Sequence, residues 1–444
     1  MRVDTATLTE LGIIPTGEHD WALRDLLDKT SCRDGLEALR GMLRTPLADV
    51  GEIYRRQTVL TRLRDLSHLV NRNELGGLVR DLGAYTTSNF VHFPRSILGG
   101  LRFSLRHRDI TDFLEARLRA LQVLLNRLEP LSSALSELQG DQLFVSILTA
   151  FRDVLTLPEV REMRLVMNDG TFSSIRLCTF DELLRAHRKL ELLALQSALA
   201  KLDAFLSLSQ TAVELGGRFP RIADRDGSAF CLKGLKHPLL PNGVGNDVEL
   251  SLDERVMFVT GPNMAGKSTI VRAIALAVYF SHLGLPVVAE DARVPLTGTL
   301  ISSMNARDNI ARGTSLYLAE VRRVKAVVEA ALSGSVVVAF LDEVFRGTNV
   351  KDAVDATELL VTGLARADRG LFVIASHLAE VAEKTECLSG VGTWQMQVTE
   401  SPTGPRFSFR LTRGISHIRL GARLLFDEGV VSMLNAFHAY QAPS

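Results

Sequence analysis

The chain carries Gly261-Pro262-Asn263-Met264-Ala265-Gly266-Lys267-Ser268-Thr269, which follows the pattern G-x-x-x-x-G-K-[ST]. In this pattern a glycine-rich turn points backbone N–H groups at a polyphosphate, and the helix that follows adds its partial positive charge. The apolar, β-prone run Val256–Thr260 precedes the loop, and apolar residues at helical spacing follow it. Strand, loop and helix in this order are the context that the pattern requires, so a chance match is disfavoured. We predict a nucleotide-binding loop, with Lys267 at the β- and γ-phosphates and Ser268 on Mg²⁺.

A second pattern places two acids after an apolar run. Val336–Leu341 reads as a buried strand, and Asp342 and Glu343 follow it directly. Because open α/β sheets bind ligands at the carboxyl ends of their strands, the acids are expected to do more than cap a strand. We predict that Asp342 holds Mg²⁺, directly or through a water, and that Glu343 orients and polarises the attacking water. His377, at the end of a later apolar strand, is a candidate contact to the γ-phosphate.

Composition sets the broad class of the protein. The chain has 444 residues, 46% hydrophobic and 23% charged, with a formal net charge of zero. These values are typical of a soluble protein with more than one domain. Its four cysteines are scattered without metal-site or disulfide spacing, and we found no signal pattern or apolar run of membrane length. We therefore expect a cytoplasmic protein without a membrane segment.

The pattern of apolar residues changes near residue 225. Residues 1–18 are weakly patterned, 19–225 are patterned as amphipathic helices, 226–430 as alternating strands and helices, and 431–444 as a short tail. In the helical part we predict helices over 110–128 and 131–155, separated at Pro130, then a D-G turn at 168–170 and a long helix over 181–215. In the second part, the strand candidates are 248–250, 255–260, 286–289, 299–303, 335–341 and 370–375. Helical segments lie between most of them, which predicts a mainly parallel sheet with helices on its faces.

A basic stretch is the candidate nucleic-acid contact. No acidic residue lies between Asp81 and Asp109, and the interval holds Arg95, Arg102, Arg106 and Arg108, with Phe93 and Phe103 between them. Arginines neutralise phosphates and aromatic rings stack on bases. A solvated or interdomain face is an equally good interpretation of the same residues.

The motifs together resemble the MutS family of DNA mismatch-repair ATPases. The ATPase part of the resemblance rests on 261–269, on 308–317 with Glu320, on Asp342-Glu343-Val344-Phe345-Arg346-Gly347-Thr348, on Ala375-Ser376-His377 and on Leu235-Lys236-His237-Pro238. The helical part rests on 26–30 and 198–203. The resemblance implies an α/β P-loop NTPase domain of the ABC type, preceded by an all-α core and lever domain. It also implies ATP and Mg²⁺ as ligands.

The resemblance further implies a head-to-tail homodimer with shared ATP sites. In this arrangement Ser315 of one subunit faces nucleotide held by the other, although a hydroxyl at a helix start is by itself better explained as an N-cap. Phe409 lies near the position of an aromatic residue that stacks on adenine in the family. Because the core motif begins near residue 20, we expect no mismatch-reading or connector domain, and a clamp domain that is short or absent.

Two functions follow as hypotheses. The first is an ATP-dependent DNA-binding protein, an ATPase-driven dimeric clamp on duplex, mismatched or branched DNA, in repair or recombination. The alternative is an ATP-gated module that uses the same dimer switch on a protein or ribonucleoprotein partner. Salt-dependent retention of DNA separates them, because contacts to phosphates weaken steeply as the salt concentration rises.

Overall fold

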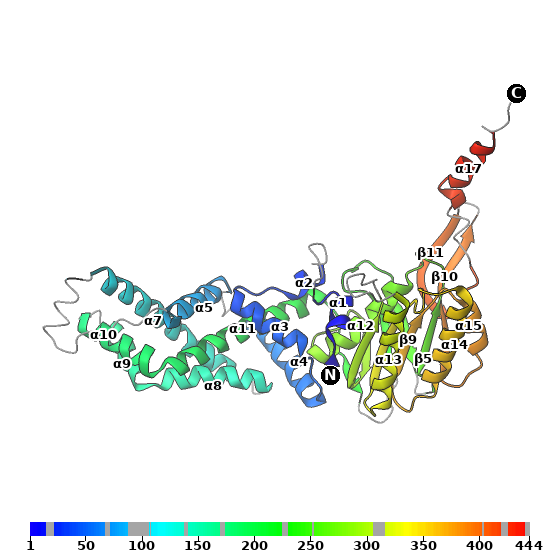
Figure 1. Cartoon of the computed structure of the whole chain (residues 1–444). Coiled ribbons are helices and arrows are strands. Elements are labelled where there is room, and N and C mark those ends of the chain that lie inside the picture. Colours follow the sequence, from blue (N-terminus) through cyan, green and yellow to red (C-terminus); the bar gives the residue numbers. More distant parts are fainter. Residues whose placement is uncertain are drawn as a thin grey trace. The chain divides into compact units, whose positions relative to one another are not determined.

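Figure 1 shows the computed structural model, which describes residues 1–14, 22–66, 72–87, 106, 108–136, 141–168, 174–223, 230–250, 253–304, 316–401, 404–418 and 425–439. Contacts between Cα atoms divide the chain into two compact units. The first contains Met1–Trp21, Leu215–His282 and Pro286–Ser444, and the second contains Ala22–Glu214 with Leu283–Leu285. The division therefore falls at the end of a long helix, whereas the boundary predicted between residues 225 and 226 lies outside the described residues.

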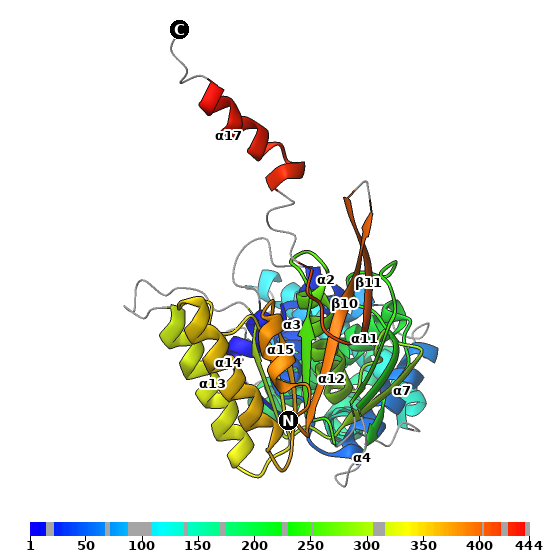
Figure 2. The ribbon, with the colours of Figure 1, turned by 90° about the vertical axis from the view of Figure 1, so that its right-hand side faces the viewer.

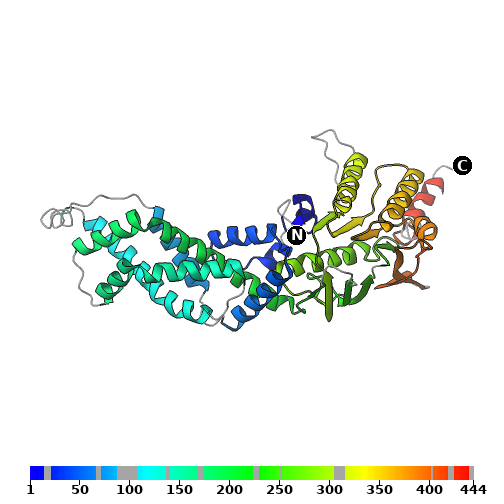
Figure 3. The same cartoon turned by 90° about the horizontal axis from the view of Figure 1, so that it is seen from below.

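The second unit is helical throughout its described residues. Its helices are α2 (Ala22–Leu27), α3 (Arg33–Arg44), α4 (Val50–Asp65), α5 (Arg72–Thr87), α7 (Arg108–Ser136), α8 (Gln142–Thr156), α9 (Pro158–Asn168), α10 (Ser174–Glu182), a π-helical turn (Leu183–His187) and α11 (Lys189–Leu215). Helix α7 packs against α5, α8, α9 and α10 (Figure 3). The rings of Phe144 in α8 and Phe205 in α11 meet edge to face, 5.5 Å apart, in the unit's core.

Two helix predictions were wrong in this unit. Helix α7 runs through Pro130, where a break was expected. A proline removes one backbone hydrogen bond, but Leu128 and Leu135 on either side of it are buried, so packing carries the helix across. The helix predicted over 181–215 is divided by the π-helical turn, where Arg185 forms a buried ion pair with Asp181. The predicted D-G turn follows the end of α9, outside the described residues.

Helix α11 also corrects the expectation that no apolar run of membrane length is present. By length and composition alone it is long and apolar enough to cross a bilayer. However, 72% of its apolar window is buried inside the structure. Buried apolar length is what the central helix of a packed bundle requires, so α11 is weak evidence for a membrane span.

The first unit is built on two sheets. The larger has seven strands in the order β1 (Arg2–Val3), β7 (Thr299–Ser303), β8 (Val337–Asp342), β9 (Leu371–Ala375), β5 (Val256–Thr260), β10 (Val391–Ser401) and β11 (Gly404–Arg413). Every neighbouring pair in it is parallel except β10 and β11. The smaller has the order β2 (Arg221–Ala223), β6 (Asp291–Pro295), β3 (Phe230–Leu235) and β4 (Asn246–Leu250). The mainly parallel sheet is as predicted.

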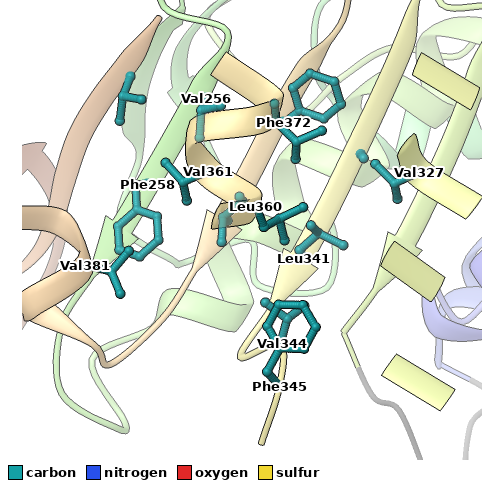
Figure 4. Packing of buried hydrophobic residues seen from close by; sticks show 14 of the residues in the cluster. Val256, Phe258, Val327, Leu341, Val344, Phe345, Leu360, Val361, Phe372 and Val381 are labelled. Carbon is teal, nitrogen blue, oxygen red and sulfur yellow. The ribbon is translucent and has the colours of Figure 1, made fainter. Parts of the chain in front are cut away.

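Helices cover both faces of the larger sheet. They are α12 (Lys267–Leu283), α13 (Leu316–Leu332), α14 (Val350–Ala365) and α15 (Ala379–Thr385), with α1 (Thr5–Glu10) and α17 (Val430–Ala439) elsewhere in the unit. Helices α13, α14 and α15 lie on one face and α12 on the other (Figure 2). Val327 of α13, Val361 of α14 and Val381 of α15 are buried in one cluster with the strand residues Phe258 and Phe372 (Figure 4). This packing fixes the strands whose carboxyl ends form the site.

Two features of this unit differ from the sequence predictions. Residues 286–289 form no strand, only an isolated bridge between Val287 and Arg218, and the strand lies at Asp291–Pro295. Residues 1–14, interpreted as a weakly patterned segment, pack on the sheet instead: β1 pairs with the edge of β7, and Glu10 accepts hydrogen bonds from Ser302 Oγ and Met304 N. Two strand residues are too few to show a period-2 pattern in the sequence.

Candidate functional site

The glycine loop lies between β5 and α12, as the pattern requires. Gly261 and Gly266 have φ angles of 149° and 98°, which a residue with a Cβ adopts only with strain. Helix α12 begins at Lys267, so its first backbone N–H groups open into the loop. The loop is therefore shaped to hold an anion at a helix N-terminus.

The side chain of Lys267 is hydrogen-bonded to the backbone of the loop. Its Nζ atom donates to the carbonyl oxygens of Gly261, at 2.7 Å, and Pro262, at 3.2 Å, and the residue is 4% exposed. Burial lowers the pKa of Lys267, while the charges of Glu343 and Asp342 oppose that shift. A phosphate can take the place of either carbonyl without moving the lysine far, because the ammonium group has three donors.

Asp342 ends β8 beside the loop. It is 7% exposed, and its Oδ1 atom has no hydrogen-bond partner among the described residues. Burial raises the pKa of Asp342, and a hydrogen bond from the side chain of Ser268 works against that rise. A buried carboxylate oxygen without a partner costs stability unless a ligand occupies it, so the pair Ser268 and Asp342 fits a hard cation such as Mg²⁺.

Glu343 follows with its backbone in the left-handed region. Its φ angle is 50°, and its N–H donates to Ala375 O at 2.8 Å, which anchors the turn to the end of β9. His377 Nδ1 lies 3.9 Å from Glu343 Oε1, and Arg346 Nη1 lies 3.4 Å from Oε2. The His377 side chain above all, with Lys267 and Arg346, lowers the pKa of Glu343.

The turn after Glu343 is held by a residue to which the sequence assigned no role. Glu320 of α13 is 2% exposed; burial raises the pKa of its carboxyl group, and the nearby backbone of residues 345–347 works against that rise. The rings of Tyr317 and Phe345 lie 6.1 Å apart, and a Cβ on Gly347 would be 2.7 Å from Tyr317 N. The first turns of α13 are thus packed directly on the turn that follows the two acids. Glu320 stood in the recognised signature segment, but its spacing alone does not reveal a partner in residues 345–347.

A cavity of about 850 Å³ adjoins the loop. Its lining includes the loop itself, Asp342, Glu343, Arg346, Met396 and Phe409, together with residues 237, 239–244 and 246 before and within β4. Leu239, Leu240 and Val244 supply apolar surface to this cavity. Burial, reinforced by the charge of Arg272, lowers the pKa of His237 to about 4, so His237 is neutral at pH 7.

The structure brings together the phosphate loop, Asp342, Glu343, His377 and Phe409 at one edge of the sheet. Ser315, Arg95 and Arg102 lie outside the described residues. Arg106 is exposed, and Arg108 begins α7 with its side chain outside the described part. The predicted contacts to a partner subunit and to DNA therefore stay predictions.

Comparison with known proteins places these motifs in a family. Residues 257–425 match the family model described as MutS domain V. The chain is 25% identical to the DNA mismatch repair protein MutS of Thermosipho melanesiensis, over 97% of this chain and 62% of that protein. It is 33% identical to MutS of Ehrlichia chaffeensis, over 46% of this chain and 25% of that protein, and 29% identical to MutS of Aquifex pyrophilus, over 49% and 25%. The chain thus spans less than two thirds of the length of these relatives.

Proposed function

We propose, because the chain belongs to the MutS family, that it binds and hydrolyses ATP and couples hydrolysis to the binding of DNA. The observation that carries the nucleotide part is the buried Oδ1 atom of Asp342, left without a partner among the described residues beside Ser268 and the phosphate loop. The relatives' printed name, DNA mismatch repair protein MutS, supports DNA as the partner and does not favour a protein or ribonucleoprotein partner.

The loop and Lys267 would bind the triphosphate. The N–H groups of α12 and of the loop would donate to its inner phosphates, and Lys267 would exchange its two carbonyl contacts for oxygens of the β- and γ-phosphates. Ser268 and Asp342 would hold Mg²⁺, which would neutralise charge on the phosphate oxygens. The lowered pKa of Glu343 keeps that residue ionised at neutral pH, so it would accept a hydrogen bond from the attacking water and orient it.

Two substitutions test the nucleotide site. Lys267→Ala should weaken equilibrium ATP binding by about tenfold or more, because it removes charge-assisted hydrogen bonds to phosphate. Glu343→Gln should retain ATP and slow its hydrolysis by about a hundredfold or more, because it removes a positioned base. Lys351→Ala, on the exposed first turn of α14, is the control and should change neither. A Glu343→Gln protein that hydrolyses ATP at the normal rate would remove Glu343 from its role.

The proposal extends to partners that the described residues do not test. We propose a homodimer with shared ATP sites, a DNA partner that is duplex, mismatched or branched, and a location in the cytoplasm. The four cysteines are free thiols, which supports a reducing compartment.

The DNA contact is testable through salt dependence. Replacing Arg102, Arg106 and Arg108 by Ala should weaken DNA binding and lower the slope of log affinity against log salt by up to about one for each arginine that neutralises a phosphate. ATP hydrolysis without DNA should stay intact. A matched triple substitution at the exposed helical residues Arg44, Arg152 and Arg161 removes the same charge and should have a smaller effect. Equal DNA affinity at every salt concentration would instead assign the basic stretch to a solvated face.

A further inference from the structure

Strand β11 contains a bulge at the mouth of the cavity. Met396 pairs with Leu411 and Val398 pairs with Phe407, so Ser408, Phe409 and Arg410 stand opposite Gln397 alone. Phe409 takes up the extra length with a φ angle of 54°, in the left-handed region. A bulky aromatic residue avoids this region unless its surroundings hold it there.

Two side chains hold the bulge: the Ser408 hydroxyl donates to Gln397 O and accepts from Arg410 N, and Asn246 ties the bulge to the strand beside it. Its Nδ2 atom donates to Phe409 O at 3.1 Å and to Val244 O at 3.2 Å, and its Oδ1 atom accepts from Leu411 N at 2.7 Å. Asn246 is 7% exposed, so water does not replace these bonds freely. An amide side chain carries one acceptor and two donors, and all three functions are used here.

The held conformation places the Phe409 ring at the phosphate loop. A Cβ on Gly266 would lie 3.4 Å from Phe409 Cδ1, so the ring lies close to the loop. The ring lines the cavity with Leu240 and Val244, yet 46% of Phe409 is exposed. An exposed aromatic face beside a phosphate site, in a cavity that apolar side chains also line, suits a flat heterocycle.

We propose that Asn246 is the positioning residue of the nucleobase subsite: it locks the bulge of β11 so that the Phe409 ring stacks on the base of the bound nucleotide. This inference rests on the proposed function, because it presumes a nucleoside triphosphate at the loop. Asn246 itself touches no part of the ligand in this assignment. It acts through its hydrogen bonds to the backbone of Phe409, Leu411 and Val244.

The experiment compares two ligands that share phosphates and differ in the base. Equilibrium affinities for ATP and for inorganic tripolyphosphate, both with Mg²⁺, are measured for wild type, Asn246→Ala, Asn246→Asp and Phe409→Ala. Asn246→Asp keeps an acceptor for Leu411 N and removes the donors, so it tests the same interaction with a smaller change in packing. Glu249→Gln, at an exposed position of the same strand, is the control and should leave both affinities unchanged. Circular dichroism verifies that each variant is folded.

Asn246→Ala should weaken ATP binding by roughly tenfold, the order of one base–aromatic stack, and leave tripolyphosphate binding unchanged. Asn246→Asp should also weaken ATP binding and leave tripolyphosphate binding unchanged. The double variant Asn246→Ala/Phe409→Ala should be no weaker than Phe409→Ala alone, because both changes remove one stack.

Equal weakening of both ligands, or independent effects in the double variant, would overturn the role of Asn246 while leaving the nucleotide site in place. Wild type that binds neither ligand would instead overturn the proposed function, and the inference with it. If Asn246→Ala does not fold, Asn246→Asp decides the matter by the same comparison of ligands.

Discussion

Glu320 is buried, ionisable and left with one oxygen, Oε2, that has no partner among the described residues. Burial raises the pKa of Glu320. A carboxyl group whose folded pKa is raised binds its proton more tightly in the folded state, so its ionisation costs stability as the pH rises past the unfolded value of about 4.3. An ionised Glu320 lowers the stability of the folded protein at neutral pH. Because it also lies against the turn that follows Glu343, we explain its presence by a role in function and not by stability.

This reasoning predicts a split between stability and turnover. Glu320→Gln should leave the thermal unfolding midpoint at pH 7 unchanged or higher, because the buried charge is gone. It should lower kcat by about tenfold, since a neutral amide interacts more weakly than a carboxylate with the backbone of residues 345–347, so the turn after Glu343 is held less firmly. The affinity for ATP should change little. Steady-state turnover and equilibrium binding, measured beside calorimetry, check the prediction, and a fall in stability that matches the fall in kcat would contradict it.

At the scale of elements, one carboxylate joins helices that lie far apart in the sequence. Asp203 of α11 is fully buried, and it accepts from Ser31 N at 2.8 Å, from Ser31 Oγ at 3.0 Å and from Cys32 N at 3.3 Å. Ser31 and Cys32 precede α3, so Asp203 satisfies backbone groups at the start of that helix. The recognised segment 198–203 thus ends on the residue that ties α11 to α3.

A pair of glycines in α3 tests this junction. A Cβ on Gly35 would lie 2.1 Å from Asp203 Oδ2, whereas a Cβ on Gly41 would meet nothing within 4 Å. Gly35→Ala should therefore destabilise the helical unit by about 2 kcal/mol or more, because the carboxylate must move and its donors are left without their partner. Gly41→Ala should stabilise it by up to about 1 kcal/mol, as expected for an exposed helix interior. Urea unfolding followed by circular dichroism measures both, and equal effects would show that Asp203 does not constrain α3.

Some elements were predictable from sequence because a local pattern specifies them. The loop at 261–269, the strand before it and the two acids at the carboxyl end of β8 each need only a short stretch of sequence, and all three lie where they were predicted. The helix break predicted at Pro130 and the strand predicted over 286–289 were wrong, because tertiary packing overrides local preference. The role of Asn246 was beyond prediction, since its partners at 409 and 411 are more than 160 positions away and only the fold brings them together.

At the scale of the whole molecule, we propose that a second subunit completes the ATP site of each chain. Lys267, Ser268 and Asp342 would serve the inner phosphates and Mg²⁺, so in our proposal the outer face of the γ-phosphate is left for a residue of a second subunit. Ser315 directly precedes α13 in the sequence and lies outside the described residues. The resemblance implies that this hydroxyl serves the nucleotide of a second subunit.

Mixing two inactive variants separates a shared site from a self-contained one. Ser315→Ala should lower kcat on the order of a hundredfold, the usual cost of removing one donor to developing charge, while ATP affinity is spared. A mixed dimer has one Ser315→Ala subunit and one Lys267→Ala subunit. If Ser315 acts on the nucleotide of the partner, the site of the Lys267→Ala subunit carries both defects and the other site carries none. Turnover should then partly return. A hydroxyl that acts on its own subunit leaves one defect in each site, and mixing restores nothing. Steady-state turnover of the mixture, with mixed dimers verified by differently tagged subunits, decides between them, and absence of recovery would refute the shared site.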